Sequence, residues 1–458
     1  MSSLLPIWQG SARASATAPR AIVSACVVWS LAGPGLLNAQ PASQPPLPPL
    51  LPASQSASPH PAPTDAVAPA PIQLQLNEVF ERAWARHPAQ RALAQRRAAS
   101  QSALKAAQSW STQPASLDIR TQTDRPGTDQ GAREVELGVS VPLWWPGQRT
   151  RAQQWAQAQG LALDARVDEA RLSLAGTLRD AWWAWLRAEV EVQLAAERAH
   201  NAATLLADVK RRVVAGDLAQ ADQHQAAGAL ALAEGAHLQA LAQRSWAAQA
   251  LAACGGWPEG TAPRLSDRPE DSAEALTTLD AQQHPAVRSA RQQAMAAREA
   301  AALAGSQVRA NPEVTLGTVH SRGPRGEATQ RALVLGLRVP LGSSPAQTTH
   351  AIQSGAEATE LEAQADMVRA EVEAAFAGAR QRLTWAQAQR DAAAKRARLA
   401  QETQAFFDKS FKWGETDLPT RLRIAQEAQE AARQAALAQI DVAAAVSALR
   451  QAAGLLPD

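Results

Sequence analysis

The chain of 458 residues contains two copies of one sequence pattern, and this duplication limits its possible folds more than any other feature. Four short segments recur at nearly the same spacing: 87–89 (His-Pro-Ala) at 284–286, 141–143 (Val-Pro-Leu) at 339–341, 216–217 (Gly-Asp) at 414–415 (Gly-Glu), and 251–256 at 449–454. A constant spacing from one end to the other indicates a tandem duplication. Each copy is therefore one structural unit, and we expect the function to come from two such units side by side.

Residues 1–39 have the features of a secretory signal peptide. Arg13 and Arg20 precede an apolar run that ends at Ala39, where we expect cleavage. A membrane anchor is the alternative, but the run is short and interrupted by Gly and Pro. Cys26 lies in a segment similar to a lipoprotein processing site, although few apolar residues precede it. Whether Cys26 is lipidated stays open.

Residues 40–71 consist largely of Pro, Ala and Ser with almost no charge, which predicts a disordered leader without a hydrophobic core. If the signal peptide is removed, Cys254 is the only cysteine left. An intrachain disulfide is then excluded, and a packing role is expected for this thiol.

The overall composition argues against several classes of function. The formal net charge is only +2, with 45 Lys and Arg against 43 Asp and Glu, so a nucleic-acid-binding role is not expected. The eight His residues are scattered, only three Met are present, and no cluster has the spacing of metal ligands. No acid–base pair or nucleophile stands out either. We therefore expect no enzyme activity, no cofactor and no metal site.

The longest predicted elements are helices. No proline occurs between Pro146 and Pro258, and apolar residues keep helical spacing over 148–214. Such a helix is about 100 Å long at 1.5 Å per residue, so no globular core can surround it and it must pack sideways against other helices. Gly216-Asp217 then predicts a hairpin tip, after which a return helix covers 218–253.

The return helix is too short to cover its long partner. A run over 76–110 has the missing length, so we expect the two short helices to stack end to end beside the long one. The second half repeats this plan over 276–308, 347–412 and 418–453. The predicted organisation is a first repeat over 72–258, a linker over 259–275 and a second repeat over 276–458.

Each repeat also contains a predicted β-hairpin, over 116–141 and 313–341, in which apolar and polar residues alternate. A small soluble sheet that caps the helices is one interpretation. The other is four strands of about ten residues that cross a bilayer when tilted. Because open sheet edges leave backbone groups unpaired in lipid, several chains would have to close one barrel.

The alternation assigns the two faces of such a barrel. An Arg that faces lipid near the middle of a bilayer costs about 2 to 4 kcal/mol, so the polar positions are expected to face the lumen. These are Asp118, Arg120, Gln122 and Arg338. The apolar positions expected to face lipid are Leu117, Ile119, Leu335 and Leu337.

Several motifs together resemble those of TolC-like outer-membrane factors, the outer membrane efflux proteins of Gram-negative bacteria. The segments that carry the resemblance are 85–88 (Ala-Arg-His-Pro), 141–149 (Val-Pro-Leu-Trp-Trp-Pro-Gly-Gln-Arg), 211–217, 311–312 (Asn-Pro), 339–341 and 413–419 (Trp-Gly-Glu-Thr-Asp-Leu-Pro). The likeness covers about 72–457, and it is greatest for the CzcC-like, cation-efflux branch.

The resemblance implies a mainly α-helical protein with a β-barrel portion. Three chains would form one twelve-stranded barrel in the outer membrane and one helical tunnel through the periplasm. It also implies a tripartite efflux system, with a periplasmic membrane-fusion adaptor at the hairpin tips and an inner-membrane transporter of the resistance-nodulation-division (RND) type. The chain would then be a passive exit channel for metal cations or other toxic small molecules. The alternatives are a type I protein-secretion duct and a periplasmic coiled-coil scaffold without a barrel.

In this family the inner end of the tunnel is closed by helix tips whose carboxylates face the pore. The residues in the matching region are Asp217, Asp222, Glu415 and Asp417. Helix capping is the alternative role for Asp217 and Asp417, because both are expected just before a helix. The candidates for contact with the adaptor are Arg212, Val213, Gly216, Gly414 and Leu418. For the two glycines, the turn geometry alone is a sufficient explanation.

Two further sets of residues are expected to be structural. His87 and His284 each precede a proline and are predicted to begin helices. Trp182, Trp183 and Trp185 lie midway along the first long helix, where packing between helices is expected rather than ligand stacking.

Overall fold

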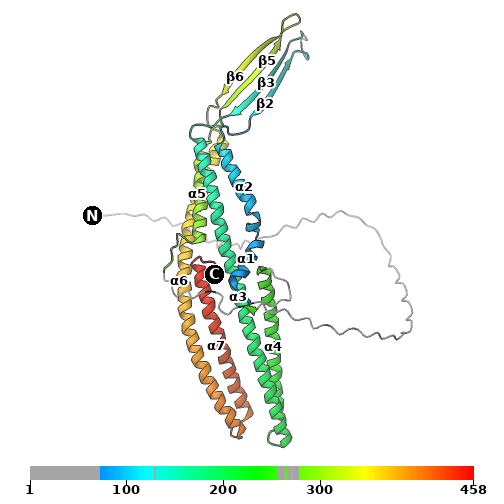
Figure 1. Ribbon diagram of the computed structural model, residues 1–458, viewed down its shortest axis with the longest axis vertical. Coiled ribbons are helices and arrows are strands. Elements are labelled where there is room, and N and C mark those ends of the chain that lie inside the picture. Colours follow the sequence, from blue (N-terminus) through cyan, green and yellow to red (C-terminus); the bar gives the residue numbers. More distant parts are fainter. Residues whose placement is uncertain (1–72, 128–129, 256–263, 266–269, 271–277, 458) are drawn as a thin grey trace, which may run out of the picture. The chain divides into compact units, whose positions relative to one another are not determined.

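The computed structural model describes residues 73–127, 130–255, 264–265, 270 and 278–457 (Figure 1). The predicted signal peptide over 1–39, the leader over 40–71 and most of the linker over 259–275 lie outside the described residues, as does Cys26. Cys254 is a free, partly buried thiol packed against the central core.

The described residues form seven helices and six strands. The helices are α1 (Leu76–Arg86), α2 (Pro88–Gln108), α3 (Gln148–Ala215), α4 (Gln220–Gly255), α5 (Pro285–Ser306), α6 (Pro345–Lys412) and α7 (Leu418–Ala452). The strands are β1 (Gln73–Leu74), β2 (Ser116–Thr123), β3 (Arg133–Pro142), β4 (Arg264–Leu265), β5 (Glu313–Arg322) and β6 (Gln330–Arg338). The mainly helical fold with four long strands agrees with the fold class predicted from the sequence.

The two long helices, α3 and α6, have 68 residues each, which corresponds to about 100 Å. Helix α2 packs along the part of α3 nearest the four-stranded sheet, and α4 packs along the remainder (Figure 1). Helix α1 contacts both α3 and α4, so the short helices stack end to end as predicted. In the second repeat α5 and α7 cover α6 in the same way, and α5 also packs against α3. Within the described ranges, no helix is both long enough and apolar enough to cross a membrane.

One expected helix boundary is wrong, and it lies at a His-Pro pair. The helix expected from residue 276 begins only at Pro285, whereas the run expected over 76–110 divides at His87, where a helix start was predicted. A residue before proline disfavours the helical conformation, so each histidine has extended backbone angles. Each imidazole Nδ1 accepts a hydrogen bond of 3.3 Å from the backbone N–H two residues later, which caps the new helix. The predicted role of His87 and His284 at helix starts is therefore confirmed.

The hairpin tips of the two repeats have the same backbone turn. Gly216 and Gly414 have positive φ angles of 87° and 81°, which favour glycine. After each glycine the next N–H bonds back to the helix, from Asp217 to Arg212 O at 2.9 Å and from Glu415 to Ser410 O at 3.0 Å. This is the Schellman arrangement, which satisfies the last carbonyl groups of a helix.

The hairpins of the two repeats join into one antiparallel sheet of order β2-β3-β5-β6. The central pair, β3 and β5, connects the first repeat to the second over ten residue pairs from Arg133↔Arg322 to Pro142↔Glu313. The outer strands, β2 and β6, each have a partner on one side only within the described chain. Both edges of the sheet therefore carry unpaired backbone N–H and C=O groups.

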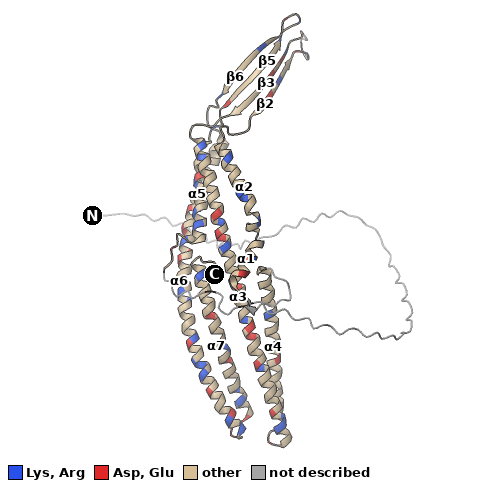
Figure 2. Ribbon diagram, in the orientation of Figure 1, with Lys and Arg blue, Asp and Glu red and all other residues tan. Residues whose placement is uncertain are grey.

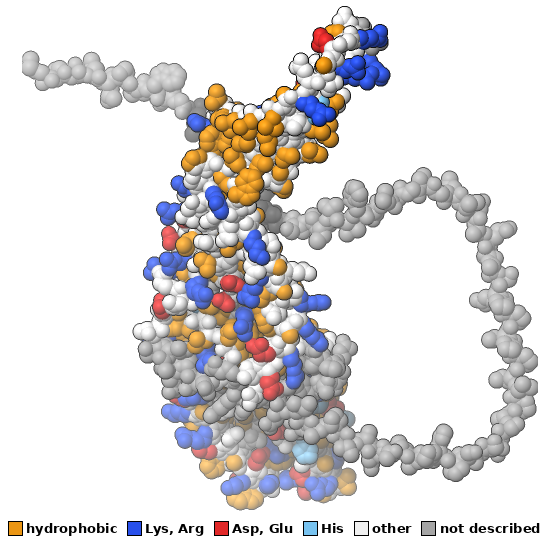
Figure 3. All heavy atoms as spheres, turned by 45° about the horizontal axis from the view of Figure 1, so that its top comes forward, with side chains coloured by type: hydrophobic (Ala, Val, Ile, Leu, Met, Phe, Trp, Pro, Cys, Tyr) orange, Lys and Arg blue, Asp and Glu red, His pale blue; other side chains and the backbone are white. Residues whose placement is uncertain are grey.

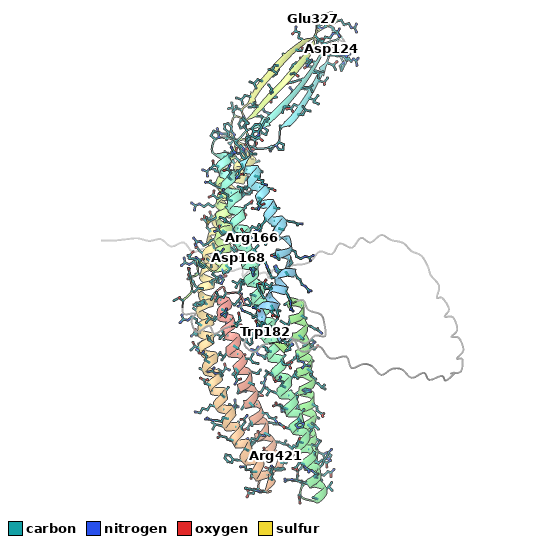
Figure 4. The ribbon with its side chains drawn as sticks, viewed as in Figure 1. Asp124, Arg166, Asp168, Trp182, Glu327 and Arg421 are labelled. Carbon is teal, nitrogen blue, oxygen red and sulfur yellow. The ribbon has the colours of Figure 1, made fainter. Side chains whose placement is uncertain are left out.

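The main hydrophobic core lies at mid-length, where α1 meets the end of α4. Trp182 is fully buried there, and Trp183 and Trp185 are nearly so (Figure 4). Phe80 and Leu251 come from α1 and α4 and pack in the same cluster. The predicted packing role of the three tryptophans is confirmed.

A buried ion pair connects the two repeats beside this core. The Arg179 guanidinium on α3 donates from Nε to both carboxylate oxygens of Glu270, at 3.1 Å each. Arg179 also donates to the side chain of Gln451 on α7 and, at 3.1 Å, to the carbonyl of Leu455. Ser447 donates to Glu270 as well. One guanidinium thus holds together the first repeat, the linker and the end of the second repeat.

His284 gives this region a dependence on pH. Burial lowers the pKa of His284 below its usual range, and a hydrogen bond with the Gln451 backbone offsets part of this effect. The folded protein therefore takes up a proton at His284 less readily than the unfolded chain. The stability from neutral His284 is present above the unfolded pKa of about 6.5 and is lost as the pH falls through and below that value.

We predict that lowering the pH from about 7.5 to about 5.5 reduces the Tm of the wild type more than that of His284→Asn. Asn preserves a capping acceptor but does not titrate. The measurement is thermal unfolding followed by circular dichroism at each pH. His350→Asn, at an exposed site on α6, serves as the control and should behave as the wild type does. Equal pH slopes for the wild type and His284→Asn would contradict the assignment.

Candidate functional site

The residues predicted to carry function lie at opposite ends of the helices, in the sheet and at the two hairpin tips (Figure 1). Charged side chains of both signs are mixed along the helices between these ends (Figure 2). The two ends are therefore described separately.

The sheet places all four polar strand positions predicted from the sequence on one face. The face is defined by pairing, because directly opposite residues and alternate residues along a strand share a side. Asp118, Arg120 and Gln122 pair with Gly138, Glu136 and Glu134, and Arg338 pairs with Glu313 on the same side. Arg120 forms a 2.9 Å ion pair with Glu136, and Ser140 donates a hydrogen bond to Asp118.

The opposite face of the sheet is apolar and exposed. Leu117 pairs with Val139, Ile119 with Leu137, and Leu335 with Leu316. Leu335 exposes 75% of its surface and Leu117 exposes 67%, so the described helices do not cover this face. Figure 3 shows a continuous hydrophobic area at the base of the sheet and its junction with the helices. The predicted separation into a polar and an apolar face is thus present in the strands.

Three tryptophans gather where the sheet joins the helices, and the sequence analysis did not identify this group. Trp144 donates from Nε1 to the carbonyl of Ser109 at 3.1 Å, and Trp145 donates to that of Ala310 at 2.8 Å. Trp110 is two-thirds exposed nearby in the chain. The signal was available in the Trp-Trp-Pro-Gly segment, which follows directly after β3.

At the other end, the two hairpin tips pack against each other. Their shared cluster contains Leu206 and Val209 of α3, Phe411 of α6 and Leu418 of α7. The first tip carries Asp217 and Asp222, and the second carries Glu415 and Asp417. The structure therefore brings the two pairs of predicted aperture carboxylates to the same end of the molecule.

The capping role of these carboxylates differs from the expectation. Asp222, and not Asp217, makes the cap contact of α4, where its carboxylate accepts a hydrogen bond of 3.0 Å from Ala219 N–H. Asp417 is the N-cap residue of α7, but its side chain makes no capping hydrogen bond. Pro419 follows two positions later and has no N–H, which removes one of the two usual donors. Asp217 and Asp417 are both exposed to solvent.

An aromatic and charged cluster connects the tips, and it was not predicted. The Phe411 ring lies between two guanidinium groups, with Arg212 at 5.0 Å and Arg421 at 4.8 Å from its centroid. Arg421 forms an ion pair of 2.7 Å with Asp408, and Arg212 forms one of 3.3 Å with Asp208 (Figure 4). Beside this cluster, a groove of about 550 Å³ runs between the hairpins. Arg212 and Phe411 lie 199 positions apart in the sequence, so their contact leaves no local pattern there.

The residues predicted to contact an adaptor are not equally accessible. Leu418 is only 1% exposed because it packs into the shared tip cluster, so this candidate does not present its side chain to a partner. Arg212 and Val213 are partly buried, and Gly216 and Gly414 form the exposed turns. Val214 and Trp413, at 90% and 76% exposure, are the large apolar side chains that the tips expose instead.

In the part of the chain that the structure describes, no three His, Cys, Asp or Glu side chains lie close enough together to hold a metal ion. The arrangement offers surfaces and apertures, and the described residues offer no grouping typical of a catalytic centre.

Comparison with known proteins gives one family and a consistent fold. Residues 79–256 match the family model described as outer membrane efflux protein. No curated protein sequence matches the chain significantly.

Solved structures match over most of the chain. The outer membrane protein VceC from Vibrio cholerae has 16% identity and a TM-score of 0.68, with 84% of this chain and 97% of VceC covered. The channel-forming protein CusC has 13% identity and a TM-score of 0.70, with 84% and 93% covered. The open MtrE outer membrane channel of Neisseria gonorrhoeae has 16% identity and a TM-score of 0.66, with 83% and 89% covered. The TM-scores show a shared TolC-like fold. The family match lies within the first repeat, and it agrees with the structural matches, of which MtrE is an outer membrane channel.

Proposed function

We propose that this chain is the exit channel of a tripartite efflux system and that three copies form one continuous duct. The three sheets together provide a twelve-stranded barrel in the outer membrane, and the helices form a tunnel through the periplasm. An adaptor of the membrane-fusion class binds at the hairpin tips, and an inner-membrane transporter of the RND type supplies the energy. We place the chain in the CzcC-like, cation-efflux branch, with metal cations or other toxic small molecules as the cargo.

The observation that carries the proposal is the incomplete sheet. Its two edges, β2 and β6, carry unpaired backbone groups, and one whole face is apolar and exposed. In lipid each unpaired backbone group costs several kcal/mol, so the edges need partners from other copies. Strands of 8 to 10 residues have about the length that a tilted strand needs to cross a bilayer.

The orientation of the strands in the barrel follows from the two faces. The apolar face with Leu117, Ile119, Leu335 and Leu337 contacts lipid, and the polar face lines the lumen. The polar positions are those with Asp118, Arg120, Gln122 and Arg338. The junction tryptophans mark the periplasmic boundary of the bilayer, because Trp is favoured at membrane–water interfaces.

The tips supply the gate and the adaptor contact. Asp217, Glu415 and Asp417 are exposed there, and three copies would repeat each carboxylate around the axis. A ring of carboxylates concentrates cations and disfavours anions, which suits metal-ion transport. Val214 and Trp413 provide exposed apolar surface for the adaptor, beside Arg212, Val213, Gly216 and Gly414.

The proposed function is tested by isolating the protein from outer-membrane fractions. Heat-stable trimers that conduct ions in planar bilayers are expected for a duct. A monomer that stays in solution without detergent would instead identify a periplasmic scaffold. Sensitivity of a deletion strain to metal salts, compared with its sensitivity to organic toxicants, tests the cargo.

The two faces of β6 provide a matched pair of substitutions. We predict that Leu335→Lys prevents trimer assembly, because a charge facing lipid near mid-bilayer costs about 2 to 4 kcal/mol in each copy. Gly336→Lys should be tolerated, since a Cβ at this position would lie 3.7 Å from its nearest neighbour on the polar face. Trimer yield in outer-membrane fractions is the measurement. Equal yields for the two variants would show that the face assignment or the barrel is wrong.

The carboxylate at the second tip is predicted to control the passage of cations. Asp417→Ala should weaken block by divalent cations several-fold, because it removes from each copy one of the negative charges that bind these cations at the aperture. Asp366→Ala, at an exposed site in the middle of α6, is the charge-matched control. If the single-channel behaviour of Asp417→Ala is unchanged, Asp417 has no role in ion passage and only a structural role at the start of α7.

The cluster around Phe411 is predicted to hold the two hairpins together and to favour the closed aperture. Arg212→Gln removes the cation–π contact between α3 and α6 and the hydrogen bond from Arg212 to the Phe411 carbonyl, together about 1 kcal/mol. The open state should then be populated about fivefold more. Arg423→Gln breaks an exposed pair with Glu427 on the same helix and should leave the open probability unchanged. Single-channel recording compares the two variants.

A further inference from the structure

A row of basic side chains ends the apolar face of the sheet, on the side away from the helices. It consists of Arg133 on β3, Arg322 on β5 and Arg331 on β6, with His320 next to them. We call these four residues the distal basic row. Figure 3 shows Lys and Arg side chains gathered at this tip of the sheet.

The register shows that the row belongs to the apolar face. Arg133 lies directly opposite Arg322, and His320 lies directly opposite Arg331. Alternate positions along a strand share a side, so Arg133 is on the face of Val135 and Leu137. In the same way Arg331 is on the face of Leu333 and Leu335. On β3 and β6, exposed leucines and valines therefore lead along the strand to a basic residue.

Among the residues that the structure describes, the arginines of the row have no countercharge. Arg133, Arg322 and Arg331 are exposed, and none of them forms an ion pair with any residue that the structure describes. Glu134 points to the opposite face, since it alternates with Arg133. Asp124 and Glu327 lie in the turns beyond the strands (Figure 4). Like charges directly opposite each other in a sheet are destabilising, so the Arg133–Arg322 pair calls for an anion that none of the described residues supplies.

The position of the row excludes a second copy as the source of this anion. Arg133 and Arg322 lie on β3 and β5, the two inner strands, whereas a neighbouring copy would pair with the edges β2 and β6. The row also lies away from the polar face that lines the proposed lumen. The row therefore faces the surroundings of the proposed barrel, at the level where the apolar face ends.

We propose that the distal basic row binds the phosphate groups of anionic lipids in the leaflet that surrounds the outer end of the barrel. This inference rests on the proposed function, which places the apolar face in lipid. Guanidinium groups bind phosphate with two parallel hydrogen bonds, and directly opposite side chains in a sheet are about 5 Å apart. None of the four strands contains Phe or Trp, so this end lacks the aromatic anchors found at the junction. Contacts with lipid phosphates take their place.

The test uses the full-length protein, purified as a trimer in a zwitterionic detergent. The temperature at which trimers dissociate is measured while diphosphorylated lipid A is added to the micelles. Phosphatidylcholine and inorganic phosphate are added in parallel titrations. The variants are Arg133→Gln with Arg322→Gln, the single change Arg331→Gln, and a control with Arg382→Gln and Arg398→Gln, which removes two exposed charges from α6.

Lipid A should raise the dissociation temperature of the wild type and of the α6 control at the same concentration. The Arg133/Arg322 double variant should need roughly thirtyfold more lipid for the same shift in dissociation temperature, and Arg331→Gln about fivefold more. The reason is that each basic residue near an anionic surface contributes a similar binding free energy. Inorganic phosphate and phosphatidylcholine should have no comparable effect.

Two results would overturn the inference while leaving the proposed duct intact. One is that conducting trimers respond to lipid A equally in the wild type and in both row variants. The other is that inorganic phosphate protects as well as lipid A does, which would identify a site for free phosphate. If no trimer forms and no conductance is seen, the duct proposal fails and this inference fails with it.

Discussion

The structure depends on a sheet that cannot complete itself. One face of the four strands is apolar and uncovered, and both edges are unpaired within the described chain. In water this surface would promote association through the edges, and in lipid the edges would each lack several hydrogen bonds. Both problems disappear when copies of the sheet join edge to edge within a membrane. The polar face and the junction tryptophans then acquire fixed positions relative to the bilayer.

The two β-hairpins stay in register only if the helices of the two repeats keep a fixed relative position, and the contact that fixes it lies far from the sheet. The central contact is the Arg179–Glu270 pair at mid-length, which also binds the end of α7. A buried ion pair does not by itself add much net stability, but loss of one partner leaves an uncompensated charge that costs about 3 to 5 kcal/mol. The pair therefore determines the relative position of the two repeats more than it raises the folding stability of the chain. His284 lies against the same segment and makes the joint sensitive to acid.

The elements that follow local rules were predictable. Long proline-free runs with helical spacing became α3 and α6, and alternating residues became the strands with the expected faces. The predictions failed where local rules competed. At His284 the restriction imposed by Pro285 outweighed the periodicity that extended the expected helix back to residue 276, so α5 starts later.

Features made by distant residues could not be read from the sequence. The Phe411 cluster joins α6 to α3 and α7, and the burial of Leu418 results from that contact. The distal basic row also depends on register, because Arg133 and Arg322 become neighbours only when β3 pairs with β5. Alternation assigned each of these residues to a face. It gave no information on which strand would lie beside which.

The two tips show how a duplicated turn has diverged in chemistry while keeping its backbone. With the spacing of the repeats, Ala219 before α4 corresponds to Asp417 before α7, and Asp222 corresponds to Thr420. In the first tip the carboxylate sits inside the helix and bonds back to the N–H of Ala219. In the second tip the carboxylate sits at the cap position itself, where Pro419 has removed a donor and the side chain faces solvent. At the helix start of the first repeat a carboxylate therefore accepts a hydrogen bond from a backbone N–H, whereas at the equivalent start in the second repeat it does not. Within the described residues the Asp417 carboxylate has no hydrogen-bond partner, so in the proposed gate the second repeat would supply the carboxylate that acts most directly on ions.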